Sequence, residues 1–158
     1  MYITDLIIND IFLLNRNYCC LALLLLRVGN PCLRLYFKNQ WDAAVRYLPW
    51  TDCAQNGADL LRMFKPLPYE KNKVQSGDTS TWDLSLFAKV LLHSRPPFVT
   101  APNLVTALKT LTNVRNDLSH SPHPRINTPD FKKAWTDACA ALSLFGAVAD
   151  DFVKVNEG

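Results

Sequence analysis

The stretch NLVTALKTLTNVRNDLSH, residues 103–120, decides what kind of fold this sequence adopts. Its apolar residues recur every three or four positions, at Leu104, Ala107, Leu108, Leu111, Val114 and Leu118. This spacing places them on one face of an α-helix. Asn103 is a residue type that caps helix N-termini. The stretch therefore predicts a helix of about five turns with one buried face.

One charged residue, Arg115, falls on this apolar stripe, eleven residues after Leu104 and close to three full turns. A charge on the buried side of a helix needs a route to solvent or an anionic partner. His120 lies about 140° around the helix from Arg115, whereas Asn116 and His120 are four residues apart and share a face. Two prolines soon after His120 favour a helix end there. We therefore expect Arg115 and His120 to converge only if the helix changes course near Ser119.

The segment 80–92 also has helical spacing. Ser80 with Asp83 three residues later resembles a capping box. Apolar residues then follow on one face, at Leu84, Phe87, Ala88 and Leu91. These features predict a helix with a broad apolar face.

The segment 128–152 predicts a long final helix that Thr128 would cap. A continuous seam follows, formed by Phe131, Trp135, Ala138, Leu142, Phe145, Ala149 and Phe152. Steps of three and four are typical of a helix face that packs against another helix. The seam is interpreted as core, with a dimer contact for part of it as the alternative.

The whole pattern predicts an all-α single domain, a bundle of four or five helices with one broken loop in the middle. No stretch alternates between apolar and polar residues with the period of two that is typical of strands. Residues 66–78 are rich in turn formers and charges, and residues 94–102 hold three prolines, so both are expected to be loops. Pro31 is expected to break the first long helix near Val28.

Composition limits the class of protein. A chain of 158 residues is the size of one domain, and its net charge of +3 permits an RNA partner without requiring one. The five cysteines are interpreted as reduced thiols of a cytoplasmic protein, most of them in the core. The three histidines do not stand at zinc-ligand spacing with any cysteine, so no metal and no other cofactor is expected.

The N-terminal part divides at about residue 17. Residues 1–17 are interpreted as an extra helix or a leader, and residues 18–155 as the helical domain. The apolar run YCCLALLLL at 18–26 has nine residues, against about 20 for a helix that crosses a membrane. We therefore expect a buried helix there and no membrane association.

The segment RNDLSH at 115–120 has the chemical groups needed to cut RNA without a metal. Arg115 can bind an anion, Asn116 is a polar hydrogen-bonding residue, and the imidazole of a histidine such as His120 exchanges protons near neutral pH. A base would remove the proton of a ribose 2′-hydroxyl, and a cation would stabilise charge on the phosphate. One histidine cannot easily serve both ends of this reaction, so two copies across a two-fold axis are a natural solution. Alternatively, Arg115 and His120 only stabilise the helix end.

Three segments in order, TWDLSLFAKVLL, LVTALKTLTNVRNDLSHSPHPRI and PDFKKAWTDACAALSLFG, resemble the HEPN (higher eukaryotes and prokaryotes nucleotide-binding) superfamily. The chain is most similar to the branch found in the DAZ-interacting RING ubiquitin ligase and in many animal multidomain proteins. The resemblance covers residues 18–155 and includes Phe131 and Trp135. It implies a dimeric helical bundle whose R-x-x-x-x-H motif forms a shared site that cuts RNA in active members.

Within this resemblance, Arg115 would hold the phosphate, His120 would be the acid/base group and Asn116 would be the polar residue after the arginine. Asp83 matches an acidic position and could pair with Arg115 and orient it; alternatively it is an ordinary acidic residue of a first helical turn. Two hypotheses follow: a metal-independent endoribonuclease that acts as a homodimer, and a non-catalytic RNA-binding or dimerisation module of regulatory or innate-immune proteins. No Lys/Arg run or aromatic platform predicts base specificity.

Overall fold

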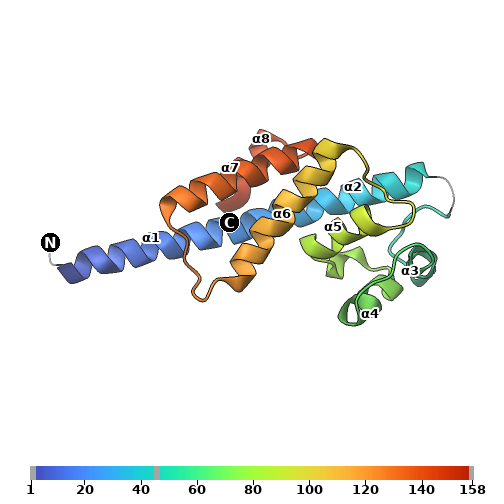
Figure 1. Ribbon diagram of the computed structural model, residues 1–158, viewed down its shortest axis with the longest axis horizontal. Coiled ribbons are helices and arrows are strands. Elements are labelled where there is room, and N and C mark those ends of the chain that lie inside the picture. Colours follow the sequence, from blue (N-terminus) through green and yellow to red (C-terminus); the bar gives the residue numbers. More distant parts are fainter. Residues whose placement is uncertain (1–2, 45–46, 157–158) are drawn as a thin grey trace.

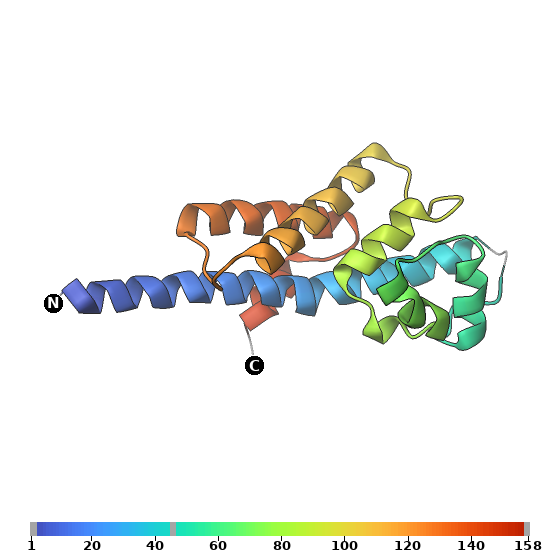
Figure 2. The same cartoon turned by 60° about the horizontal axis from the view of Figure 1, so that its bottom comes forward.

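The helices are arranged around one long rod in the computed structural model, which describes residues 3–44 and 47–156, with side chains from Asp10 onward. The rod consists of α1 (Ile3–Leu24), a π-helical segment (Leu25–Gly29) and α2 (Asn30–Ala43). It spans the length of the molecule, and the first turns of α1 extend past the other helices (Figures 1 and 2). Residues 3–17 therefore form the beginning of this rod.

The prediction that Pro31 breaks the helix near Val28 is wrong. A proline inside a helix lacks an N–H donor, and its ring clashes with the carbonyl four residues earlier. Here the backbone N–H of Asn30 donates to the carbonyl of Leu25, five residues earlier, so the turn before Pro31 is wider than an α-turn. Such a bulge moves the carbonyls that the proline ring would meet, and α2 continues the rod.

The described residues form six further α-helices, which the sequence predicted only in part. The longer ones are α5 (Leu84–His93), α6 (Pro102–His120) and α7 (Thr128–Leu144), and the short ones are α3 (Ala54–Leu61), α4 (Lys71–Ser76) and α8 (Ala149–Val153). Single 3₁₀ turns are Pro68–Glu70, Thr79–Thr81 and Lys154–Asn156. The described residues contain no strand, so the all-α prediction is confirmed. The count of four or five helices was too low because short helices lack a readable period, and residues 66–78 are largely helical.

The apolar faces predicted from spacing form the core. α6 packs on α7 and α5, α5 packs on α2, and α7 packs on α1. The stripe of α6 is buried from Ala107 to Leu118, with Leu104 half-buried, and the four apolar residues predicted on α5 are all buried. Leu21, Leu24 and Leu25 contribute the inner face of the rod.

All three predicted helix starts were displaced. The carboxylate of Asp83, three residues after Ser80, caps α5 by accepting the backbone N–H of Leu86 at 2.9 Å. Asn127 caps α7 in place of Thr128, because its side-chain oxygen accepts the N–H of Asp130 at 2.8 Å. In α6 the helix begins at the proline before Asn103 and has no side-chain cap. Neighbouring Asp, Asn, Ser and Thr residues are interchangeable as caps, and tertiary packing chooses among them.

The predicted final seam does not continue to Phe152. α7 ends at Leu144, and Gly146 has a φ of +105°, a left-handed conformation that favours glycine. The chain therefore turns before α8. Ala149 is exposed, although Phe152 still packs against the core.

The prediction that most of the cysteines lie in the core is wrong, because none of the five is fully buried and only Cys32 and Cys139 pack against the core. Cys19 and Cys53 are exposed, and Cys20, Cys32 and Cys139 are only partly buried. The sequence placed three of them in apolar or helix-forming segments, but a residue in such a segment is buried only if its side of the helix faces the core. All five are free thiols in the structure.

The helix Asp10–Ala43 is long and apolar enough, by length and composition, to cross a membrane. Its most apolar window has a mean hydropathy of 1.5, and 28% of that window is buried. A helix in the core of a protein can have the same length and composition, and this helix carries part of the core on one face. The expected absence of membrane association stays a prediction.

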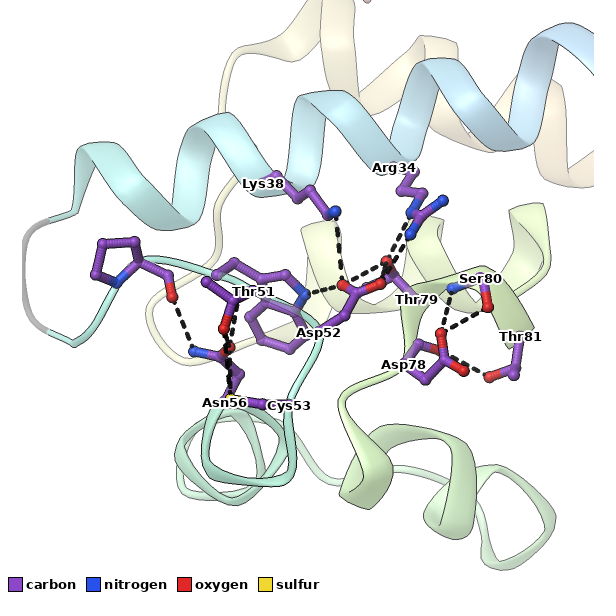
Figure 3. Close-up of polar contacts among 12 residues, drawn as sticks. Arg34, Lys38, Thr51, Asp52, Cys53, Asn56, Asp78, Thr79, Ser80 and Thr81 are labelled. Carbon is purple, nitrogen blue, oxygen red and sulfur yellow. Dashed lines mark hydrogen bonds and ion pairs between the residues drawn. The ribbon is translucent and has the colours of Figure 1, made fainter.

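Asp52 joins α2 to the turns that precede α3 and α5 (Figure 3). Its carboxylate accepts hydrogen bonds from Arg34 Nη2 at 2.8 Å, Trp50 Nε1 at 2.6 Å and Thr79 Oγ1 at 2.8 Å, with Lys38 Nζ at 3.6 Å. Burial of the carboxyl opposes its ionisation, but these hydrogen bonds and the Lys38 charge outweigh burial and lower the pKa of Asp52. Asp52 thereby attaches the α3–α4 region to the rod.

The change Asp52→Asn is expected to lower the free energy of unfolding by roughly 1–3 kcal/mol at pH 7, because charge-assisted hydrogen bonds are lost. A carboxyl whose pKa is lower in the folded state stabilises above its unfolded pKa of about 3.9 and loses that effect as pH falls through the folded value. The difference between parent and variant should therefore shrink below about pH 4. Urea denaturation across this pH range measures it, and a constant difference would contradict the assignment.

Candidate functional site

Arg115 lies at the junction of α5 and α6, where its guanidinium meets the first residue before α5. Arg115 Nη2 donates to Asp83 Oδ2 at 3.2 Å. The Arg115 side chain is 38% exposed and that of Asp83 is 45% exposed. The arginine on the apolar stripe therefore has both an anionic partner and access to solvent, the two conditions that the sequence indicated.

Asp83 has two roles through its two carboxylate oxygens. Oδ1 accepts the backbone N–H of Leu86 and caps α5, and Oδ2 binds Arg115. Asp83 is thus itself the cap of α5 rather than an acidic residue of its first turn, so the interpretations as the third residue of a Ser80 capping box and as an ordinary first-turn acid are wrong. The contact with Arg115 that the sequence suggested is present. Because the cap holds the carboxylate at the end of a helix, the guanidinium of Arg115 is directed by a fixed backbone element.

Asn116 completes this group. Its side-chain oxygen accepts a hydrogen bond from Arg115 Nη1 at 3.4 Å, and the residue is partly buried. A guanidinium has five N–H donors, and these two contacts use only part of them. The remaining donors, with the exposed fraction of the side chain, leave Arg115 able to bind a phosphate oxygen.

His120 is the last residue of α6 and is exposed, as predicted for a helix end. The helix stays regular up to this residue, so Arg115 and His120 remain about 140° apart around the axis. Among the described residues no hydrogen bond or ion pair joins them. The structure thus brings together Asp83, Arg115 and Asn116, and it leaves His120 on another face of the same helix.

The end of α6 is attached to the rod by side chains that the sequence did not point out. Tyr18 Oη donates to the carbonyl of Leu118 at 3.1 Å. Asn17 Nδ2 donates to the carbonyl of Ile126 at 3.1 Å, and the N–H of Ile126 donates to the carbonyl of Leu14 at 3.1 Å. These contacts position the loop after His120. The feature of the sequence that could have indicated these contacts is a polar residue, Asn17, inside an otherwise apolar helix.

The thiol of Cys53 is another chemically reactive group that the sequence patterns did not indicate. It precedes α3, and the backbone N–H of Asn56 together with the Thr51 hydroxyl lowers the pKa of its thiol. The thiol is exposed. It lies in the α3 region and is separate from the RNDLSH segment.

Changing Asp83 should separate its two roles. Asp83→Asn keeps a good cap but removes the charge, and we expect a loss of about 0.2–1 kcal/mol in unfolding free energy because the ion pair is exposed to solvent. Asp83→Ala also removes the cap and should cost roughly a further 1 kcal/mol. A double-mutant cycle with Arg115→Ala, measured by urea denaturation, isolates the pair. Equal losses for the Asn and Ala variants would show that Asp83 does not act as the cap.

The chain matches no family model, no curated protein and no solved structure in comparisons with known proteins. The described residues form an all-α helical bundle, and a proposal for the function depends on the site itself.

Proposed function

We propose that this chain is a HEPN-type domain that acts in the cytoplasm on RNA phosphodiesters as a homodimer, without a metal. The observation that carries the proposal is the Asp83–Arg115–Asn116 group at the start of RNDLSH, which holds a partly exposed guanidinium beside a capped helix end. The resemblance of the sequence to HEPN domains implies functional roles for the same three residues.

The reaction would be an internal transfer. The ribose 2′-oxygen forms a bond to the adjacent phosphorus while the bond from phosphorus to the 5′-oxygen breaks. A base takes the 2′-hydroxyl proton, an acid protonates the leaving 5′-oxygen, and Arg115 stabilises charge on the phosphate. The products are a 2′,3′-cyclic phosphate and a 5′-hydroxyl, with no water or metal consumed.

A homodimer suits this reaction because of where His120 lies. Arg115 and His120 occupy different faces of α6, so one copy does not present both to one phosphate. An in-line displacement also needs its base and acid on opposite sides of the phosphorus. Two copies related by a two-fold axis would supply two His120 side chains around a shared phosphate.

A second candidate function is a non-catalytic dimerisation or RNA-binding module of a regulatory or innate-immune protein. Its supporting observation is that Asp83 already neutralises Arg115. In addition, the rod exposes large apolar side chains, with Phe12 69%, Leu26 60% and Leu35 61% exposed. Such a surface fits an interaction role.

The test is incubation of the purified chain with labelled single-stranded and structured RNA in EDTA, with end-group analysis of products and light scattering of the protein. Cleavage by a dimer to fragments that end in 2′,3′-cyclic phosphate is the expected result. A dimer that leaves both RNAs intact would reject the nuclease and favour the interaction module. A monomer that cuts RNA would reject the shared site.

A further inference from the structure

A groove lined by basic residues lies at the far end of α5 from the Asp83–Arg115 pair. It has a volume of about 870 Å³ and is formed by the end of α3, the chain that follows it, the start of α4 and the end of α5. Its basic residues are Arg62, Lys65, Lys71, His93 and Arg95, all of them exposed. α3 and α4 lie at the end of the molecule away from the N-terminus (Figure 1).

The charge of this groove is not neutralised by the protein. The groove lining contains no acidic residue. In the described part of the chain, none of its five basic side chains forms an ion pair. The neighbouring acids are buried and engaged elsewhere: Glu70 binds Lys89 Nζ at 3.1 Å, and Asp59 accepts from Gln55 Nε2 at 3.2 Å. The site therefore concentrates positive charge well beyond what a net charge of +3 suggests.

The fold brings these residues together from separate parts of the sequence. The backbone N–H of Arg95 donates to the carbonyl of Met63 at 2.7 Å, which joins the chain after α5 to the chain after α3. Phe64, the residue after Met63, is buried. α5 ends at His93, and the next residue, Ser94, bonds back to Val90 with its hydroxyl at 2.6 Å. The groove thus has a backbone joined by hydrogen bonds and exposed charged side chains along it.

We infer that this groove binds the phosphate backbone of single-stranded RNA and leads it toward the RNDLSH segment. The inference rests on the proposed function. Exposed Lys and Arg side chains spread along a groove are the arrangement by which proteins follow a nucleic-acid strand without reading its sequence. A site for one small phosphate would instead have buried donors that converge on a point. His93 at the end of α5 lines the groove and Asp83 before its start binds Arg115, and a helix of ten residues is about 15 Å long.

An exposed aromatic ring accompanies the basic groove. Tyr69 is 73% exposed and stands in the 3₁₀ turn just before Lys71. Lys89 Nζ lies 5.8 Å from the centre of the ring on one side. A ring that is this exposed can stack on an RNA base, and stacking is tolerant of base identity. The ring supports a nucleic acid as the ligand over a protein with acidic side chains.

The experiment measures binding of a fluorescein-labelled 20-nucleotide single-stranded RNA by anisotropy over a range of salt concentrations. The full chain carries His120→Ala so that the probe stays intact. In this background, Arg62→Ala with Lys65→Ala is compared with Lys109→Ala plus Lys132→Ala, two exposed lysines on α6 and α7 with the same change in net charge. Inorganic pyrophosphate at matched ionic strength is the competitor.

Loss of two phosphate contacts should reduce the slope of log affinity against log salt by about 1.4, and should weaken binding about 25-fold at 0.1 M salt. The control pair should keep the parental slope. Equal losses of RNA affinity in both pairs of variants would show that the groove contributes only non-specific charge, which would overturn the inference. Displacement of the RNA by pyrophosphate alone would also overturn it, in favour of a small-anion site.

The experiment gives different results when the groove inference is wrong and when the proposed nuclease function is wrong. If the parent chain cuts RNA and the groove variants bind RNA like the parent, the groove inference is wrong and the proposed function stands. If the groove variants lose binding and the parent chain cuts nothing, the groove inference stands and the nuclease is rejected. If both hold, the groove variants should raise the RNA concentration for half-maximal cleavage and keep the saturated rate.

Discussion

Replacing His120 by alanine is expected to slow RNA cleavage by about 10²–10⁴-fold, the usual contribution of one acid–base group. His120 is the last residue of α6, and its exposed side chain can reach a ligand without any rearrangement of the core. Removing the imidazole leaves the Asp83–Arg115 pair intact, so RNA binding should persist while proton transfer is lost. Single-turnover cleavage of a labelled RNA in EDTA measures the effect.

His123→Ala is the matched control, because His123 lies three residues further along and is also exposed. It should cut RNA at the parental rate. Light scattering must show the same mass for both variants and the parent, and urea denaturation the same stability. If His120→Ala cuts as fast as His123→Ala, the acid–base role of His120 is wrong, and the histidine is left as a structural residue at a helix end.

Phe37→Ala is expected to lower the free energy of unfolding by about 3–5 kcal/mol. Phe37 has no exposed surface. Its ring centre lies 4.8–6.1 Å from those of Trp41, Trp50, Trp82 and Phe98. Alanine would lose the transfer energy of the ring and leave a cavity between large aromatic rings that cannot easily close. Urea denaturation followed by tryptophan fluorescence measures the change.

Leu35→Ala is the control on the same helix, because this leucine is 61% exposed. Its effect on unfolding should stay within about 0.5 kcal/mol. A similar loss from both variants would mean that helix propensity rather than the aromatic cluster determines the cost. The outcome also matters for the basic groove, because the same cluster joins the rod to the chain around Trp50 and Trp82 that supports the α3–α4 region.

The two ends of α5 carry the two proposed elements of function. Asp83, at its N-terminal end, directs Arg115, and His93, at its C-terminal end, lines the basic groove. α5 packs on both α2 and α6, so it is fixed on two sides. A rigid helix of this kind would keep a constant distance between a strand-binding groove and the phosphate at Arg115.

Local patterns predicted the helices that pack most regularly. The stripes of α5 and α6 were read correctly because their apolar residues keep a period of 3.6 over two or more turns. The need of Arg115 for an anionic partner also followed from its place on the buried stripe, and Asp83 was a named candidate for that partner. The short helices α3 and α4 were missed because their eight and six residues hold too few apolar repeats to show a period.

Boundaries were predicted less well, for a different physical reason. The local sequence allows several nearly equivalent places for a helix to begin, end or bulge. The structure selects one of them in four cases: the caps at Asp83 and Asn127, the turn at Gly146 and the bulge before Pro31. The alternatives differ by about 1 kcal/mol or less in free energy, and the free energy of packing elsewhere in the molecule is larger than this difference.

The sequence by itself determined the all-α class, the buried faces of the main helices and the chemical types of the candidate site, because these depend on residue spacing along one helix. Only the tertiary structure decided that Asp83 meets Arg115, that His120 faces away from both, and that Arg62, Lys65, Lys71, His93 and Arg95 share one groove. Such groupings join residues tens of positions apart in the chain. They depend on how helices pack, which no local pattern in the sequence encodes.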